Sequence, residues 1–363
     1  MQADVGIIGA GPAGIAAAVA ATRAGVSVVL IDRGRFPRPK VCGGCLNGRA
    51  VAVLDRLGLS GTLDAASTTT AYRVGLEGAA FTTPLPSGRA ISRFAWDAAM
   101  VEAARAAGVT VLTQTHARLQ PAADPATRTL SLVAGDSTAE LTARLVIAAD
   151  GLTQSATRAE RSLRTIPASG GRLGSGALLE DGDAYAPGTI HMATAADGYV
   201  GLVRVERGRL NVAAALDADA LCDRSLAEAT AAIVTSAGWP VPSDWHTATW
   251  TGTPPLTRST PSPVGWRVAT AGDAAGYVEP FTGEGMAWAL AAGEAVGCRA
   301  GDWLDDPDCL QREWPRCYRR VVARRRRICQ ALAWTLRRPR LMRAVFPVAS
   351  LAVRPAAWAM NRR

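Results

Sequence analysis

The chain has 363 residues, 48% hydrophobic and 20% charged, which is typical of a globular protein and excludes a disordered or collagen-like chain. Its formal net charge of +9 would suit a nucleic acid or an anionic membrane as partner. The charge is local, however: residues 312–363 hold fifteen arginines and one acid, Glu313, a net of +14 that leaves −5 elsewhere. No recognition motif accompanies the arginines, so we expect no nucleic-acid partner.

We expect a cytoplasmic protein. The N-terminus shows neither the charged nor the apolar region of a signal peptide, and no uncharged apolar run reaches the ~18 residues of a spanning helix. The seven cysteines are scattered and odd in number, which favours reduced thiols. The three histidines show no metal-ligand spacing, and we expect no metal site.

The first 32 residues have the pattern of a βαβ unit that binds a dinucleotide. An apolar run ends at Ile8, Gly9-Ala-Gly-Pro-Ala-Gly14 and an alanine-rich helix follow, and a second strand ends at Asp32. In this GxGxxG pattern Gly9 allows the tight turn, Gly11 lets a pyrophosphate approach, and Gly14 lets helix and strand pack closely. The helix N-terminus would face the phosphates, and Asp32 would accept hydrogen bonds from ribose hydroxyls.

Two later segments favour FAD over NAD. A strand ends in Asp150-Gly151, and another ends in Gly272-Asp273, followed by Pro280-Phe-Thr-Gly-Glu-Gly-Met286 and a helical stretch. In this order the three motifs resemble the FAD-binding triplet of the para-hydroxybenzoate hydroxylase superfamily. The resemblance implies that Asp273 holds the ribityl chain. It also implies that the helix opened by Gly283-Glu-Gly-Met286 points its N-terminus at the flavin pyrimidine edge, where it would stabilise negative charge.

The segment Arg93-Phe-Ala-Trp-Asp97 opens an amphipathic helix and resembles the superfamily's Arg-x-x-hydrophobic-Asp segment, whose arginine lies near the cofactor. Local pairing of Arg93 is the alternative. The backbone near Ala117 would border the adenine.

The loop from Phe36 to Gly48 narrows the resemblance. Its segment Lys40-Val-Cys42-Gly43-Gly44-Cys45 resembles the geranylgeranyl reductase family, in which this loop passes beside the isoalloxazine with the cysteine on the substrate side. Lys40, the only lysine, could contact flavin, an anionic substrate head or NADPH, or be a solvated loop residue. Cys42 and Cys45 could form a redox dithiol, but we favour small residues that line a flavin loop.

Residues 161–261 have the short strands and turns of a separate substrate half. The segments 198–208 and 209–215 predict a hairpin that turns at Arg207-Gly208. The resemblance implies that the strand with Tyr199 faces the flavin across the substrate cavity, although the family's tryptophan and Phe-Pro ending are missing here. Four tryptophans could wall a lipophilic pocket or pack in the core; they are Trp239, Trp245, Trp250 and Trp266.

The C-terminal arm, residues 311–363, combines arginines with apolar residues such as Trp314, Tyr318, Val322 and Cys329 at helical spacing. Beyond Leu336, prolines divide it into short segments. A basic face opposite an apolar one is typical of a helix that lies on anionic lipid, here the inner membrane face. The alternative is an arm packed over the FAD-binding domain with its arginines in water.

We therefore predict an α/β fold: a three-layer Rossmann-type FAD-binding domain (GR2 type), an inserted antiparallel β-sheet substrate domain and a C-terminal helical arm. The FAD-binding domain would comprise residues 1–66, 88–160 and 262–310, and the substrate domain residues 67–87 and 161–261. Catalytic roles are expected for Lys40, Cys42 and Tyr199. The residues expected to bind the cofactor are Gly9, Gly11, Ala13, Gly14, Asp32, Arg33, Cys42, Gly43, Gly44, Arg93, Ala117, Asp150, Gly272, Asp273, Gly283, Gly285 and Met286.

The resemblance implies an FAD-dependent oxidoreductase whose reduced flavin delivers hydride to a C=C bond of a lipophilic substrate, such as a polyprenyl chain. The chain has no second GxGxxG in the right order, so the electrons would come from transiently bound NAD(P)H, an external carrier or the substrate. One alternative is a monooxygenase that hydroxylates an aromatic or polyketide substrate through a C4a-hydroperoxyflavin. A halogenase is disfavoured because the Trp-x-Trp-x-Ile-Pro motif is absent. A flavin-binding, membrane-associated module without turnover is the non-enzyme alternative.

Overall fold

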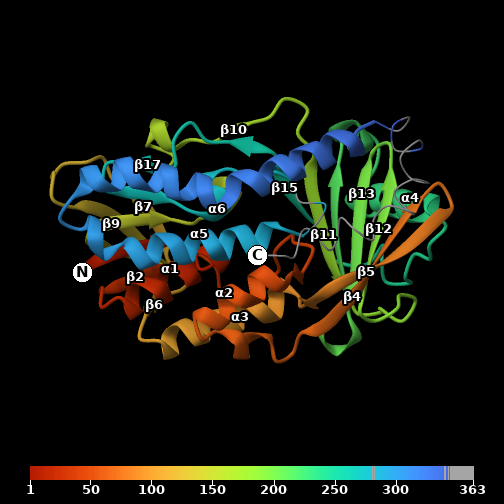
Figure 1. The fold of residues 1–363 in the computed structure, drawn as a ribbon, viewed down its shortest axis with the longest axis horizontal. Helices are drawn as coiled ribbons and strands as arrows, with labels where there is room; N and C mark the ends of the chain where they lie inside the picture. Colours follow the sequence, from red (N-terminus) through yellow and green to blue (C-terminus); the bar gives the residue numbers. More distant parts are fainter. Residues whose placement is uncertain (280, 282, 339–340, 342, 344–363) are drawn as a thin grey trace.

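The computed structural model describes residues 1–279, 281, 283–338, 341 and 343. Two large β-sheets lie next to each other along the long axis of the molecule, and long helices cover the first of them (Figure 1). A short additional pair joins β10 (Ile166–Pro167) to β16 (Arg258–Ser259). This mixed α/β architecture with a C-terminal helix confirms the predicted fold class, while the domain boundaries stay a prediction.

The first sheet has a parallel centre in the order β18-β9-β1-β2-β6, with β17 added at one edge and the hairpin β7–β8 attached to β9. The long β9 pairs antiparallel with β8 through its first half and parallel with β1 through its second half. The carboxyl ends of the parallel strands therefore meet at one edge, which is where open α/β sheets bind ligands. The strands are β1 (Gln2–Ile8), β2 (Val28–Ile31), β6 (Thr110–Leu112), β7 (His116–Leu119), β8 (Arg128–Ala134), β9 (Ser137–Ala148), β17 (Val264–Gly265) and β18 (Val268–Thr270).

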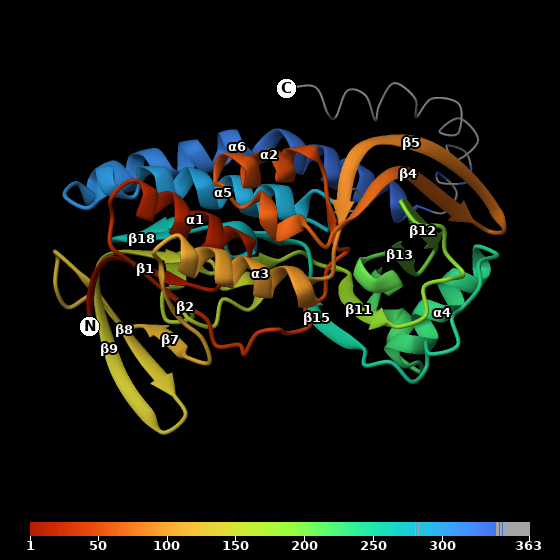
Figure 2. The same cartoon turned by 90° about the horizontal axis from the view of Figure 1, so that it is seen from below.

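Helices α1 and α5 pack almost backbone to backbone. A Cβ on Gly293 would collide with the carbonyl oxygen of Ala13, and one on Gly297 with that of Ala17. Small residues on both helices thus allow the close approach. Figure 2 shows α1, α5 and α6 on one side of the first sheet and the β7–β8 hairpin on the other. The helices are α1 (Pro12–Arg23), α2 (Gly48–Arg56), α3 (Arg93–Ala106), α4 (Leu226–Ser236), α5 (Gly285–Arg299) and α6 (Pro307–Leu336).

The second sheet has the order β15-β11-β14-β13-β12-β4-β5-β3, antiparallel except where β4 meets β12. The predicted hairpin is confirmed: β13 and β14 pair antiparallel, and the chain turns at Arg207 and Gly208, both with positive φ. Helix α4 packs on this sheet with Trp239 and Trp245. The strands are β3 (Cys45–Leu46), β4 (Ser67–Leu76), β5 (Ala79–Ala90), β11 (Leu173–Leu179), β12 (Thr189–Ala195), β13 (Gly198–Arg204), β14 (Leu210–Leu216) and β15 (Thr251–Pro255).

Helix α6 packs against α5 and the core of the first sheet. The indole of Trp314 donates to the carbonyl oxygen of Thr270 over 3.1 Å, and the hydroxyl of Tyr318 donates to that of Ala275 over 3.1 Å. Val322 and Cys329 are buried in the same core as α1 and α5. Of the two predicted arrangements for this part of the arm, the packed one holds for these four residues, because their apolar surface is buried inside the protein.

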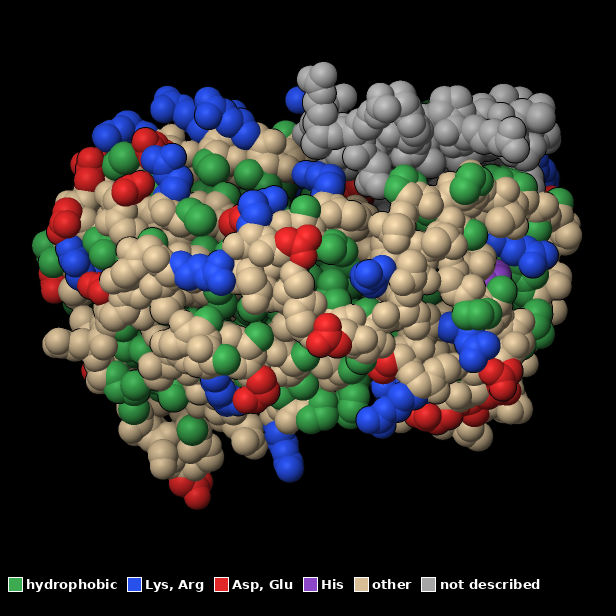
Figure 3. Space-filling view, turned by 60° about the horizontal axis from the view of Figure 1, so that its bottom comes forward, with side chains coloured by type: hydrophobic (Ala, Val, Ile, Leu, Met, Phe, Trp, Pro, Cys, Tyr) green, Lys and Arg blue, Asp and Glu red, His purple; other side chains and the backbone are tan. Residues whose placement is uncertain are grey.

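The outer side of α6 carries the positive charge. Figure 3 shows Lys and Arg side chains gathered along the edge where α6 runs, with both signs of charge mixed over the rest of this face. The proline-divided part of the arm, residues 339–363, lies outside the described residues except for Leu341 and Arg343. Within the described part of the chain, no helix is both long enough and apolar enough to cross a membrane.

Candidate functional site

A cavity of about 800 Å³ begins at the carboxyl ends of β1, β2 and β9 and extends beneath the second sheet. Its volume lies in the range of sites that bind cofactors and small molecules. The loop of residues 39–45 passes between its two ends. The predicted site residues that line it are Gly9, Gly11, Asp32, Arg33, Lys40, Cys42, Gly43, Ala117, Asp150, Tyr199, Asp273 and Gly283.

The glycine-rich turn after β1 has the geometry of a phosphate cradle. Gly9 has a φ of +103°, and a Cβ there would collide with the carbonyl oxygen of Ala149. A Cβ on Gly14 would collide with the carbonyl oxygen of Gly9, so only glycine lets α1 approach the strand. At Gly11, by contrast, the position of a Cβ is open toward the cavity. The nearest atoms are the Arg93 Nη2 at 3.8 Å and the Lys40 Nζ at 3.9 Å, two cations next to the place where a phosphate would lie.

Asp32 ends β2 with its carboxylate held in a fixed orientation. Oδ2 accepts a hydrogen bond of 2.8 Å from the backbone N–H of Ala10, and Oδ1 accepts one of 2.7 Å from that of Gly34. Arg38 pairs with Oδ2 at 3.3 Å. The carboxylate lines the cavity. Oδ1 can accept a further hydrogen bond, as the predicted ribose contact requires, whereas Oδ2 already accepts from Ala10 and Arg38.

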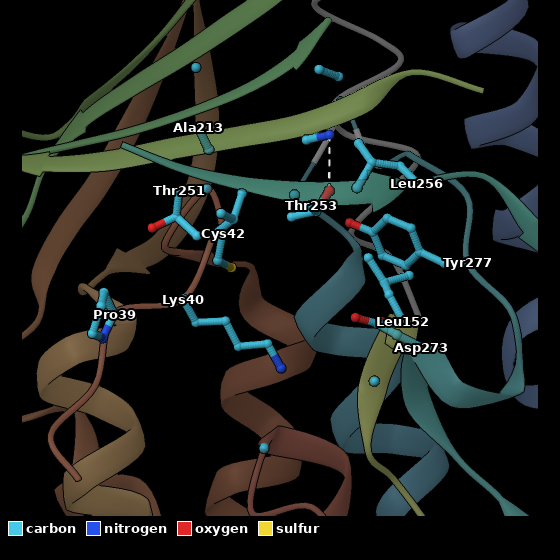
Figure 4. A pocket seen from close by; sticks show the side chains of 18 of the residues that line it. Pro39, Lys40, Cys42, Leu152, Ala213, Thr251, Thr253, Leu256, Asp273 and Tyr277 are labelled. Carbon is cyan, nitrogen blue, oxygen red and sulfur yellow. Dashed lines mark hydrogen bonds between the residues drawn. The ribbon is translucent and has the colours of Figure 1, made fainter. Parts of the chain in front are cut away.

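Lys40, Asp150 and Asp273 form a polar group at the end of the cavity next to Gly11. In Figure 4 the Lys40 side chain extends toward Asp273. Desolvation, together with the nearby Arg93, lowers the pKa of Lys40. Burial raises the pKa of Asp273 against the opposing effect of Lys40 and Arg93, and it raises that of Asp150 to about 6. Charged groups shifted in this way are poorly solvated and favour polar ligands.

Asp150 also has an unused acceptor. Its Oδ2 accepts a hydrogen bond of 2.9 Å from the backbone N–H of Ala156, while its buried Oδ1 has no hydrogen-bond partner among the described residues. An orphaned acceptor, a glycine cradle and two cations are what the phosphates and hydroxyls of FAD require. The residues present therefore fit FAD. Lys40 lies at the end of the cavity next to Gly11, among the groups that fit the phosphates of FAD. Its catalytic role stays a prediction.

Arg93 has contacts that fit both of its predicted roles, local pairing and a position near the cofactor. Its buried guanidinium pairs with Asp97 through hydrogen bonds of 2.5 and 2.8 Å, and its Nη2 is one of the two cations beside Gly11. Burial alone would lower the pKa of Arg93, but Asp97 and the Cys42 thiol outweigh it and raise the pKa. The residue is therefore a fixed positive charge at the cavity wall.

The loop with Cys42 and Cys45 holds two free thiols. Burial and the neighbouring Cys42 raise the pKa of Cys45 to about 12, and its Sγ donates to the carbonyl oxygen of Gly43 over 3.3 Å. Thiol exchange needs the thiolate, which this environment disfavours. Gly44 has a φ of +69°, and a Cβ there would lie 2.9 Å from the carbonyl oxygen of Ile91, so glycine lets the loop pass close to its neighbours.

The other end of the cavity has an aromatic wall. Tyr199 contacts Phe281 edge to face with ring centroids 5.1 Å apart, and Tyr72 contacts Phe281 in the same way at 6.0 Å. The Tyr72 hydroxyl donates to the carbonyl oxygen of Phe281 over 3.0 Å. Sequence reasoning selected Tyr199 but missed Tyr72, Phe281 and the cavity-lining Tyr277. The sequence feature that could have identified Phe281 is its position two residues before Gly283, a predicted cofactor-binding residue.

Other predicted residues shape the framework of the site. A Cβ on Gly272 would lie 2.8 Å from that of Ala13, so this pair sets the contact between the turn after β18 and α1. Gly285 begins α5, and the Met286 side chain is buried in the core.

The four tryptophans lie outside the cavity wall. Trp245 packs on Trp250 at 5.1 Å and Trp239 contacts His191 within the core of the second sheet, which confirms the core interpretation for these three. None of the four lines the described cavity, so the alternative of a tryptophan-walled pocket is wrong. Trp266 donates to the carbonyl oxygen of Pro125 over 3.2 Å. Among the described residues no His, Cys, Asp and Glu side chains gather into a group that could hold a metal.

Solved structures of flavoenzymes share this fold. The p-nitrophenol 4-monooxygenase of Pseudomonas putida superimposes with a TM-score of 0.79 at 18% identity, covering 99% of this chain and 98% of that one. The flavin-dependent halogenase CmlS gives a TM-score of 0.73 at 22% identity, covering 88% of this chain and 62% of that one. At these levels of sequence identity, the similarity shows a shared fold alone.

Two curated relatives and one family match parts of the sequence. A menaquinone reductase of Mycolicibacterium smegmatis is 57% identical over 63 residues, and one of Mycobacterium tuberculosis is 59% identical over 58 residues. These matches cover 17% and 16% of this chain and only 15% and 14% of the relatives' own lengths. The profile of the family described as FAD binding domain matches residues 2–296. The chain therefore belongs to the FAD binding domain family.

Proposed function

We propose that this enzyme transfers hydride from reduced flavin to a C=C bond of a lipophilic substrate, as in the geranylgeranyl reductase-like branch. The observation that carries the proposal is the change of lining along the cavity. Polar and charged groups gather where the cofactor would lie, and beyond the Cys42 loop the wall becomes apolar. Its apolar side chains are Val74, Phe81, Leu85, Ile190, Met192, Leu202, Val203, Leu256 and Phe281.

When bound, FAD would supply the hydride and accept electrons from NAD(P)H or from an external carrier. Lys40 and Arg93 would balance the phosphate charge, and Asp32, Asp150 and Asp273 would accept hydrogen bonds from hydroxyl groups. The apolar side chains of the second sheet would bind an isoprenoid chain and keep water away from the reacting carbons. The partial likeness to menaquinone reductases supports a substrate with such a chain.

The test is anaerobic. The FAD-loaded enzyme is photoreduced and mixed with polyprenyl compounds, a menaquinone among them, while flavin absorbance is followed. Substrate-dependent reoxidation that yields a product with two more hydrogens in its polyprenyl chain is the expected result. A flavin that stays reduced with every polyprenyl acceptor, or a quinone head reduced with an intact side chain, would contradict the proposal.

A second candidate, hydroxylation of an aromatic or polyketide substrate, is favoured by hydroxyl groups in the same cavity. Thr83, Thr251, Thr253 and Tyr277 line it and could bind a phenolic compound. In Figure 4 the Tyr277 hydroxyl points toward the middle of the pocket. Oxygen uptake that rises on adding a phenolic substrate and NAD(P)H, with incorporation of one oxygen atom into the product, would support this candidate.

An anionic membrane surface is the proposed partner of α6, because a lipophilic substrate is held in membranes. Its arginine face remains exposed after the apolar face has packed inside the protein. The exposed arginines of the described part of the helix include Arg312, Arg316, Arg319, Arg320 and Arg327.

A further inference from the structure

A cluster of four charged side chains lies directly behind the aromatic wall. Arg172 pairs with Asp217 at 3.3 Å and with Glu279 at 3.5 Å, and Glu279 pairs with Arg337 at 3.4 Å. The side chains of Arg172 and Glu279 are completely buried. Two positive and two negative charges balance within this charge cluster, as a buried ionic group requires.

The charge cluster joins three distant parts of the chain. Arg172 and Asp217 flank strands β11 and β14 of the second sheet, Glu279 lies in the segment that leads into α5, and Arg337 caps the end of α6. Arg337 also donates a hydrogen bond of 2.5 Å to the carbonyl oxygen of Gly170. Its guanidinium therefore ties α6 to both the second sheet and the segment before α5.

The charge cluster contacts the aromatic wall on the side that faces away from the cavity. Tyr277 and Phe281, two residues on either side of Glu279, line the cavity, while Glu279 itself is paired with the arginines. The Arg172 guanidinium lies 5.8 Å from the centroid of the Tyr199 ring, which also contacts Phe281. A displacement of Glu279 would thus be transmitted to the Tyr199–Phe281 contact.

We propose that Glu279 and Arg337 are positioning residues through which α6 fixes the aromatic wall of the active site. Neither side chain needs to touch substrate or cofactor. The inference rests on the proposed function in one respect, namely that the wall borders the substrate. Loss of Arg337 would leave the buried charge cluster with a net negative charge and Glu279 with one of its two arginine partners, so the segment before α5 would relax.

The experiment uses the full-length FAD-loaded protein and two readouts that need no substrate. These are the visible circular dichroism of bound flavin and the rate at which oxygen reoxidises photoreduced flavin. In Arg337→Gln we expect altered flavin dichroism and faster reoxidation, because a displaced wall shields the reduced flavin less well. The expected acceleration is about tenfold, within the ~100-fold change in reactivity that a misplacement of ~1 Å can cause. The matched control is Arg338→Gln, at the neighbouring exposed arginine just past the end of α6, which should behave as the wild type.

The double variant Glu279→Gln/Arg337→Gln separates positioning from mere stability. It removes one charge of each sign and leaves Arg172 paired with Asp217, so both readouts should return most of the way to wild type. Arg337→Lys, which keeps the charge, should give an intermediate result and serves if Arg337→Gln does not fold. A double variant no closer to the wild type than Arg337→Gln, or an Arg337→Gln protein identical to Arg338→Gln, would overturn the inference. Because neither readout involves a substrate, this failure is distinguishable from a failure of the proposed reduction.

Discussion

Asn211 of β14 donates a hydrogen bond of 2.9 Å from Nδ2 to the carbonyl oxygen of Cys42. The contact links the second sheet to the loop that separates the two ends of the cavity. It lies close to Gly44, where a Cβ would be 3.2 Å from the Asn211 amide nitrogen. The position of the Cys42 loop is therefore determined by a strand almost 170 residues away in the sequence.

Replacing this amide should loosen the loop. In Asn211→Leu the Cys42 carbonyl loses its donor, and we expect a loss of about 1–3 kcal/mol in the free energy of unfolding. Reoxidation of reduced flavin by the polyprenyl substrate should slow by about tenfold while FAD affinity stays near wild type. Denaturant unfolding and stopped-flow absorbance measure the two effects. Gln120→Leu, which removes an amide far from the cavity, is the control; equal effects in both variants would refute a specific role for Asn211.

The contact between α1 and α5 should be intolerant of a methyl group. In Gly293→Ala the new Cβ meets the Ala13 carbonyl oxygen, so α1 must move and carry the phosphate turn with it. We expect a loss of about 1–3 kcal/mol in stability and weaker FAD binding. Thermal unfolding and flavin fluorescence titration provide the measurement. Gly61→Ala, where the nearest atom would be 3.9 Å from the Cβ, should be neutral, and an unaffected Gly293→Ala would show that the helices can separate freely.

Lys40 offers a chemical test because the chain has no other lysine. An amine-acylating reagent should modify only Lys40 and the N-terminus, and bound FAD should protect Lys40 alone. Mass spectrometry of the apo and FAD-loaded protein reports the protection directly. Lys40→Gln should bind FAD about tenfold more weakly, since one charge contact next to a phosphate is lost. Equal modification with and without FAD would place Lys40 outside the cofactor site.

The pKa of Lys40 also predicts a pH dependence of FAD binding. Desolvation and Arg93 lower this pKa, so the ammonium form is lost at a lower pH than for an ordinary lysine. FAD affinity should therefore fall as the pH rises into the alkaline range, and the fall should be absent in Lys40→Gln. Fluorescence titrations of FAD binding to the wild type and to Lys40→Gln across the alkaline range measure this pH dependence.

Asp150 should destabilise the apo-protein at neutral pH. Burial raises its pKa from the ordinary 3.8 to about 6, so the folded state binds the proton more tightly than the unfolded state. This residue's contribution to stability is therefore complete below pH ~4 and is lost as the pH rises through about 6. Asp150→Asn keeps an acceptor for the Ala156 N–H, and it should raise the melting temperature of the apo-protein at pH 7 but not at pH 4. A uniform change at both pH values would contradict this account.

The arginine face of α6 should determine binding to anionic vesicles. The triple variant Arg319→Gln/Arg320→Gln/Arg327→Gln removes three exposed charges, each contributing about 1 kcal/mol at such a surface, so affinity should fall by about a hundredfold. Co-sedimentation with phosphatidylserine vesicles measures it, with phosphatidylcholine vesicles and the corresponding triple Lys variant as controls. Unchanged binding would mean that these residues of α6 have no membrane role.

The sequence by itself determined the nucleotide-binding unit. The turn from Gly9 to Gly14 and the acid at Asp32 are specified within one βαβ segment. A positive φ or a missing Cβ is a local requirement that only glycine meets. The hairpin at Arg207-Gly208 was predictable for the same reason. Arg93 and Asp97, four residues apart on one helix, are likewise neighbours by helical geometry alone.

Only the tertiary structure decided which apolar faces became core and which polar groups met across the molecule. The spacing of Trp314 and Tyr318 fits a lipid-facing helix and a packed one equally, and the choice depends on whether α5 presents a complementary surface. Tyr199 meets Phe281, and Glu279 meets Arg172 and Arg337, only after two sheets and a long helix have assembled. Such contacts depend on how many side chains from distant segments pack together in the same buried space. A local sequence pattern does not specify that packing.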